Sequence, residues 1–172
     1  MRETQCKVLR YFAYTVEILV IFIIQQTPGL LPEIFASRPT PLLPIALSIA
    51  VFERESASMA FGLFCGFLVD FGMGYALGFH ALLLAVFCYA ISLMAGNLLK
   101  TNLLTAMLTA AVALPVIYLL QWVFFYVLFN YDYPAYALTQ HYLPRLCYTF
   151  VLMPLTYYFN RAFALLIKPR ED

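Results

Sequence analysis

Charged residues are scarce in this sequence. Only 11% of its 172 residues are charged, and the formal net charge is +1, whereas about a quarter of an ordinary soluble domain is charged. Such a chain lacks the basic patch that marks proteins binding nucleic acid. Because 64% of the residues are hydrophobic and several apolar runs approach bilayer length, the composition predicts an integral membrane protein.

The sequence also lacks the motifs of common enzyme chemistry. It contains no HExxH, GxSxG or Walker sequence, and its two histidines, His80 and His141, stand alone near span ends. The four cysteines form no CxxC pair, and three lie in apolar runs, which is typical of buried thiols. No signal-peptide cleavage site follows the first apolar run. We therefore expect no catalytic residue, no metal site and no cofactor.

The apolar runs predict an all-α polytopic membrane protein, a compact bundle of about six transmembrane helices forming one domain over residues 1–172, with no soluble domain. The second run, LLPIALSIAVF, amounts to only about 17 Å of helix. It must borrow flanking residues, bend at Pro44 or sit in a thinned bilayer. Pro115 and Pro154 are expected to kink the last two spans. The predicted spans are 8–25, 42–52, 57–71, 79–99, 103–128 and 143–167.

The basic residues predict how the chain crosses the membrane. Six spans put both termini on one side, and the segments of the other side hold only Arg38 and Arg145. Positive charge collects in cytoplasmic segments, so both termini are predicted to be cytoplasmic. The loop NYDYPAYALTQHY, with Trp122 and Tyr126 nearby, is typical of an aromatic belt at the outer interface. The basic residues of the terminal side are Arg2, Lys7, Arg10, Arg54, Lys100, Arg161, Lys168 and Arg170.

A polar stripe crosses the first apolar run. Arg10, Tyr14, Glu17 and Gln25 fall within about a quarter of a helix circumference, so the stripe is expected to face other helices. Glu17 has two interpretations. It is an intramembrane contact for an ion, a proton or a substrate, or it is a carboxyl group hydrogen-bonded to a neighbouring helix.

A row of small residues ending in an acid marks the third span. Ser58, Gly62, Gly66 and Asp70 are spaced by four and wind slowly along one helix face. The two glycines form a GxxxG motif, which allows close helix packing. The row serves either internal packing or a partner. Asp70 is expected to accept backbone N–H bonds from the following FGMG, although a ligand-binding role is the alternative.

The polar turn ERES lies between the second and third spans, on the predicted cytoplasmic side. Glu53, Arg54 and Glu55 are either an ordinary solvated turn or a docking point for a cytoplasmic partner. The sequence favours neither interpretation.

The stretch from residue 38 to residue 84 resembles the MreD family of rod shape-determining proteins. That family has a proline before a short second span, a polar turn, a Gly-x-x-x-Gly-[Phe/Leu]-x-x-Asp helix and a glycine-containing hairpin leading into G-x-x-A-L. The turn corresponds to residues 53–56. The other matching positions are Pro41 or Pro44, Gly62, Gly66, Phe67, Asp70, Gly78, Ala81 and Leu82.

The resemblance implies a non-enzymatic scaffold of the bacterial cell-elongation machinery in the plasma membrane. Such proteins partner MreC, a single-span protein with a periplasmic domain. They work alongside MreB, RodA and a class B penicillin-binding protein in peptidoglycan synthesis. The family is also distantly similar to the substrate-binding membrane subunits of energy-coupling-factor transporters. A transporter subunit that binds a small molecule in an intramembrane cavity is therefore the alternative function, with Glu17 as its main support.

Overall fold

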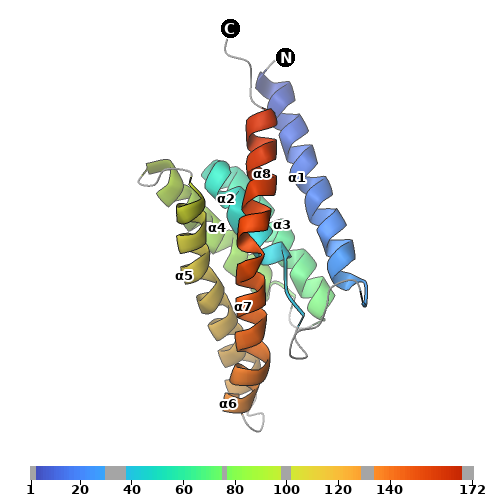
Figure 1. Ribbon diagram of the computed structural model, residues 1–172, viewed down its shortest axis with the longest axis vertical. Helices are drawn as coiled ribbons and strands as arrows, with labels where there is room; N and C mark the ends of the chain where they lie inside the picture. Colours follow the sequence, from blue (N-terminus) through green and yellow to red (C-terminus); the bar gives the residue numbers. More distant parts are fainter. Residues whose placement is uncertain (1–2, 30–37, 75–76, 98–101, 129–133, 168–172) are drawn as a thin grey trace.

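The computed structural model describes residues 3–29, 38–74, 77–97, 102–128 and 134–167. These residues are helical apart from short connections, so the chain is an all-α membrane protein (Figure 1). The elements are, in order, α1 (Glu3–Gln26), α2 (Leu42–Phe52), α3 (Glu55–Met73), α4 (Phe79–Asn97), α5 (Leu103–Trp122), the π-helical turn η1 (Val123–Val127), α6 (Pro134–Ala137), the π-helical turn η2 (Leu138–Tyr142), α7 (Leu143–Val151) and α8 (Met153–Leu166).

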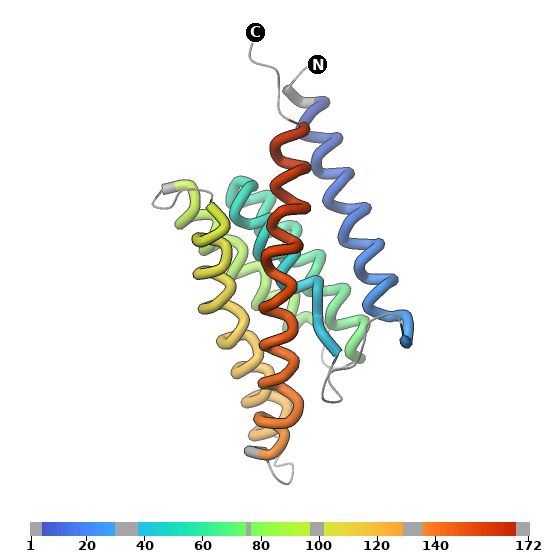
Figure 2. Tube along the Cα trace, viewed as in Figure 1, coloured from blue at the N-terminus to red at the C-terminus, as the bar shows by residue number. Residues whose placement is uncertain are grey.

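Four helical stretches of the described chain are long and apolar enough to cross a membrane. They begin in α1, α3, α4 and α5, and the last continues through η1 to Val127. The start of α1 and the end of α8 lie at the same end of the bundle (Figure 2). The predicted bundle of helices is therefore confirmed.

The short second helix, α2, forms the centre of the bundle. Every residue from Leu42 to Val51 is buried, and α2 contacts α1, α3, α4, α5, α7 and α8. A helix covered on all sides needs no polar face, which explains why Ser48 is the one polar residue in its sequence. Pro44 falls in the first turn of α2, where a missing N–H costs no helical hydrogen bond.

A buried, non-helical segment compensates for the shortness of α2. Pro39 and Thr40 are buried ahead of the helix, and Figure 1 shows this segment entering the interior of the bundle. The Thr40 N–H donates to Thr149 Oγ1 at 3.3 Å, and the Thr40 hydroxyl bonds to the hydroxyl of Tyr118. Tyr118 in turn bonds to Thr149 at 3.0 Å. Irregular backbone is tolerated at this depth because neighbouring helices satisfy its polar groups.

The sixth predicted span consists of two helices instead of one. α7 ends at Val151 and α8 begins at Met153, although the two run nearly in line (Figure 1). Pro154 has no N–H to donate to the carbonyl of the preceding turn. The Leu152 N–H bonds to Thr149 O at 3.2 Å, a tighter turn than that of an α-helix. By contrast, Pro115 lies inside α5 without ending it.

Several sequence predictions fall outside the described residues. They concern the start of the aromatic loop (residues 130–133) and four of the basic residues used to predict topology. Those four are Arg2, Lys100, Lys168 and Arg170.

Candidate functional site

The small-residue row of α3 lies against α4. Ser58 Oγ donates to the Cys88 carbonyl oxygen at 2.8 Å. A Cβ atom added at Gly62 would lie 2.7 Å from the Leu84 carbonyl oxygen, and one added at Gly66 would lie 2.5 Å from the His80 carbonyl oxygen. The glycines therefore let the two backbones approach more closely than any side chain would allow. The row is occupied by the protein's own fourth helix.

Asp70 ends this row and caps the start of α4. Its carboxylate accepts the backbone N–H groups of Gly78 at 2.8 Å, His80 at 3.1 Å and Ala81 at 3.3 Å. The expected donors in FGMG are not the ones observed, because Gly74 adopts a left-handed conformation (φ 66°) and bonds to the backbone carbonyl of Asp70. A carboxylate at a helix N-terminus satisfies free N–H groups and complements the helix dipole.

His80 completes the Asp70 site, although the sequence suggested only an isolated interfacial histidine. Its Nδ1 lies 2.7 Å from Asp70 Oδ1, and both side chains are almost fully buried. Sequence spacing offered one signal, since His80 follows the glycine hairpin that returns the chain toward Asp70. The other histidine, His141, is exposed at the end of η2.

The polar turn between α2 and α3 is divided between interior and surface. Glu53 is buried and pairs with Arg10 of α1, whose Nε and Nη2 lie 2.6 Å and 3.0 Å from the two carboxylate oxygens. The Glu53 carbonyl oxygen also accepts a bond from Ser92 Oγ at 2.6 Å. Arg54 is exposed and Glu55 half-buried. Of the three docking candidates, Glu53 is thus engaged within the bundle.

Replacing Arg10 with glutamine is expected to destabilise the protein less at acid pH than at neutral pH. Burial raises the pKa of Glu53, and the Arg10 guanidinium opposes that rise. Without Arg10, the folded state binds a proton at Glu53 more tightly than the unfolded state does. Stability then falls as pH rises from the ordinary carboxyl pKa to the raised one. Thermal unfolding of wild type and Arg10→Gln across pH measures this. A stability deficit that does not change with pH would contradict it.

The polar stripe of α1 faces the bundle along most of its length. Tyr14 is fully buried between Phe61 of α3 and Phe163 of α8, with ring centroids 5.7 and 6.3 Å away. Glu17 is half-buried, and its Oε1 accepts a bond from Asn160 Nδ2 at 3.4 Å. Gln25 is half-buried near the other end of α1. Asn160 was missed by sequence reasoning, because one asparagine in an apolar run gives no sign of its partner.

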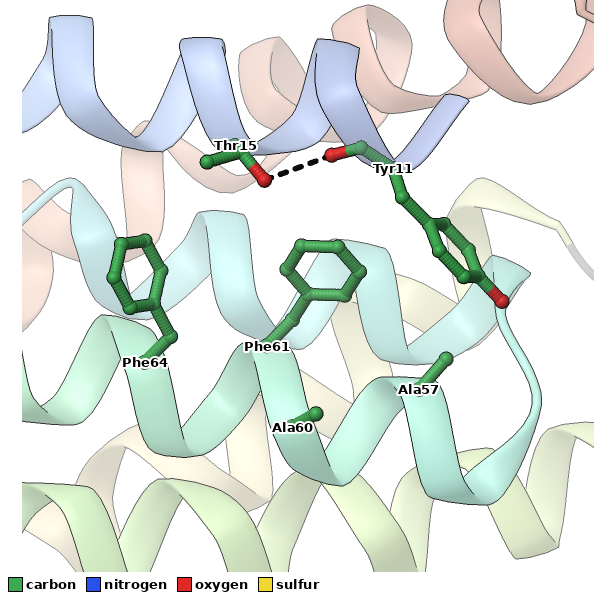
Figure 3. A pocket seen from close by; sticks show the side chains of 6 residues that line it. All are labelled: Tyr11, Thr15, Ala57, Ala60, Phe61 and Phe64. Atoms are coloured by element: carbon green, nitrogen blue, oxygen red, sulfur yellow. Dashed lines mark hydrogen bonds between the residues drawn. The ribbon is translucent and has the colours of Figure 1, made fainter. Parts of the chain in front are cut away.

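A groove of about 320 Å³ separates α1 from α3. Figure 3 shows Tyr11 and Thr15 of α1 across from the phenylalanines of α3, above the small side chains of Ala57 and Ala60. Tyr11 meets Phe61 edge to face at 5.6 Å, and the Thr15 hydroxyl bonds to its own helix. The lining is therefore apolar, and small residues form its floor. The lining residues are Tyr11, Thr15, Ala57, Ala60, Phe61 and Phe64.

The first helix is the least buried of the four long apolar stretches. Only 11% of its most apolar window is buried, compared with 33–39% for the others. Large apolar side chains such as Phe12, Val16 and Ile23 are exposed along it. The groove and the exposed apolar side chains of α1 thus form a surface that the rest of the described chain leaves uncovered.

Cysteine, histidine and acidic side chains do not gather into a metal centre in the described part of the chain. All four cysteines are free thiols.

Comparison with known proteins gives one match. The family model described as "rod shape-determining protein MreD" matches residues 5–166. No match was found among curated proteins or among solved structures.

Proposed function

The chain belongs to the MreD family of rod shape-determining membrane proteins, and on that premise we propose that it is a non-enzymatic scaffold of the bacterial cell-elongation complex. In this role it binds the single-span protein MreC and through it supports MreB, RodA and a class B penicillin-binding protein in peptidoglycan synthesis. The observation that carries the proposal is the match over residues 5–166. The large membrane-facing surface on α1 supports it.

We propose the groove between α1 and α3 as the place where the span of MreC docks. The GxxxG face of α3 is occupied by α4, so a partner must use another surface. Helix association in lipid depends on close van der Waals packing, which small residues permit. Ala57 and Ala60 offer such a floor, and aromatic rings flank it. Because α1 packs weakly on the bundle, it can adjust to a helix inserted beside it.

We also propose that both termini are cytoplasmic. Lys7 and Arg10 lie near the start of α1, Arg161 lies toward the end of α8, and Arg54 follows Glu53, which pairs with Arg10. These four basic residues therefore belong to the end of the bundle that holds the start of α1 and the end of α8. Arg145 belongs to the opposite end, near the start of α7. The positive-inside rule assigns the first end to the cytoplasm, where the exposed Arg54 is available to cytoplasmic partners.

Filling the groove is expected to weaken the complex. Ala60→Trp should reduce the MreC that co-purifies with the protein on the order of tenfold, equivalent to about 1.4 kcal/mol of binding free energy. The matched control is Ala90→Trp, which places the same ring on an exposed position of α4. Equal recovery of MreC with the two variants, when both remain folded, would rule out the groove as the docking place.

A further inference from the structure

Three polar side chains from three helices meet inside the bundle. Asn160 of α8 donates through Nδ2 to Ser48 Oγ of α2 at 2.7 Å and to Glu17 Oε1 of α1 at 3.4 Å. The same amide group also bonds to the Thr156 carbonyl oxygen at 3.0 Å. The Ser48 hydroxyl donates its own hydrogen bond to the Ile45 carbonyl oxygen at 2.9 Å. Every donor in this cluster is therefore already used.

Two acceptors of the cluster have no donor. Glu17 Oε2 and Asn160 Oδ1 are buried, and neither has a hydrogen-bond partner within the described part of the chain. Asn160 and Ser48 are completely buried. Buried polar atoms are nearly always paired, and an unpaired carboxylate oxygen away from water is especially costly. The cluster therefore lacks a hydrogen-bond donor for these two oxygen atoms.

The surrounding helices supply no charge to neutralise Glu17. Arg10 lies about two turns away on α1 and pairs with Glu53. Two titratable side chains that interact electrostatically with Glu17, Tyr14 on α1 and Cys65 on α3, are both neutral at physiological pH. α2 carries no charged residue, and the nearest one along α8, Arg161, is exposed.

A proton fits these two acceptors better than a metal ion does. A proton bound to one oxygen needs only a second oxygen to accept its hydrogen bond. A hard cation such as Mg²⁺ or Ca²⁺ requires six or more oxygen ligands, and the cluster has only two unpaired ones.

We propose that Glu17, Asn160 and Ser48 form a proton-binding site in which Glu17 holds the proton and Asn160 accepts its hydrogen bond. Binding converts the carboxylate to a neutral acid and supplies the missing donor. The site thereby fastens α1 to α2 and α8 inside the membrane. A second polar contact between α1 and the rest of the bundle, the Arg10–Glu53 ion pair, lies about two helical turns away along α1.

Infrared spectroscopy of the protein in lipid vesicles at neutral pH tests this proposal. The infrared difference spectrum between wild type and Glu17→Gln should contain the C=O stretching band of a protonated carboxylic acid. The Asn160→Leu substitution should shift the frequency of that band. The same band is expected in sodium and in choline buffers. The proposal is overturned if Glu17→Gln removes a carboxylate band instead, or if the acid band appears only when sodium is absent.

Thermal unfolding provides a second test that does not depend on spectroscopy. Glutamine is the neutral counterpart of protonated glutamate, so Glu17→Gln should keep the wild-type melting temperature at neutral pH. Raising the pH should lower the melting temperature of wild type and leave that of Glu17→Gln less affected. The proposal is contradicted if Glu17→Gln melts well below wild type at neutral pH and its melting temperature depends on pH as that of wild type does. That result would show that Glu17 is ionised in the folded protein. Neither test involves MreC, so failure here leaves the scaffold function intact.

Discussion

The Asp70→Ala variant is expected to lose most of its folded fraction on heating. This loss should be larger than that caused by any other single substitution of a polar residue. Three backbone N–H groups and the His80 ring depend on this one buried carboxylate. Leaving one buried donor without its hydrogen-bond partner typically costs about 1–3 kcal/mol, and lipid offers no water to replace the lost bonds. Fluorescence-detected size-exclusion chromatography after heating measures the surviving folded fraction.

Asp70→Asn separates the role of the charge from that of the hydrogen bonds. Asparagine keeps one carbonyl oxygen for the N–H groups at the start of α4 and remains a good helix cap, so this variant should retain an intermediate stability. The account of Asp70 as a cap would be wrong if Asp70→Ala and wild type lost their folded fraction at the same temperature.

Gly66→Ala is expected to have the second largest effect, although it adds a single methyl group. The new Cβ would lie 2.5 Å from both the Ala81 amide nitrogen and the His80 carbonyl oxygen. These are backbone atoms, which cannot rotate away, so α3 and α4 must separate and the Asp70 cap must move with them. Overpacking of this kind typically costs about 1–3 kcal/mol. The melting temperature in detergent micelles reports the change.

Gly96→Ala is the matched control for that prediction. A Cβ at Gly96 meets no atom within 4 Å, and alanine favours a helix over glycine by about 1 kcal/mol. Gly96→Ala should therefore melt at or slightly above the wild-type temperature. If both alanine variants behaved like wild type, close packing of α3 on α4 would not be what the glycine row provides.

The local features of the fold could be predicted from the sequence. The 11 residues of α2 were identified with their observed bounds, because a largely apolar run between Pro41 and a polar turn has few other interpretations. The spacing of Ser58, Gly62 and Gly66 indicated a close-packing face. Spacing could not say whether α4 or a partner covers that face, since a GxxxG motif has the same form in both cases.

Contacts between distant segments were beyond sequence reasoning. Glu17 and Asn160 are 143 positions apart, and Thr40 and Thr149 are 109 apart. Single polar residues in apolar runs do not identify their partners, because many pairings satisfy the same hydrogen bonds. A kink at Pro154 was predicted, but the sequence could not say that the span divides into two helices at Leu152, since a proline permits either a kink or a new helix.

Crosslinking across the groove tests the central proposal most directly. A photoreactive amino acid is placed at Ala60, on the groove floor, or at Ala90, on the exposed face of α4, and the protein is irradiated in membranes that contain MreC. The account predicts a crosslink to the transmembrane span of MreC from position 60 and none from position 90. A crosslink from position 90 with none from position 60 would contradict it.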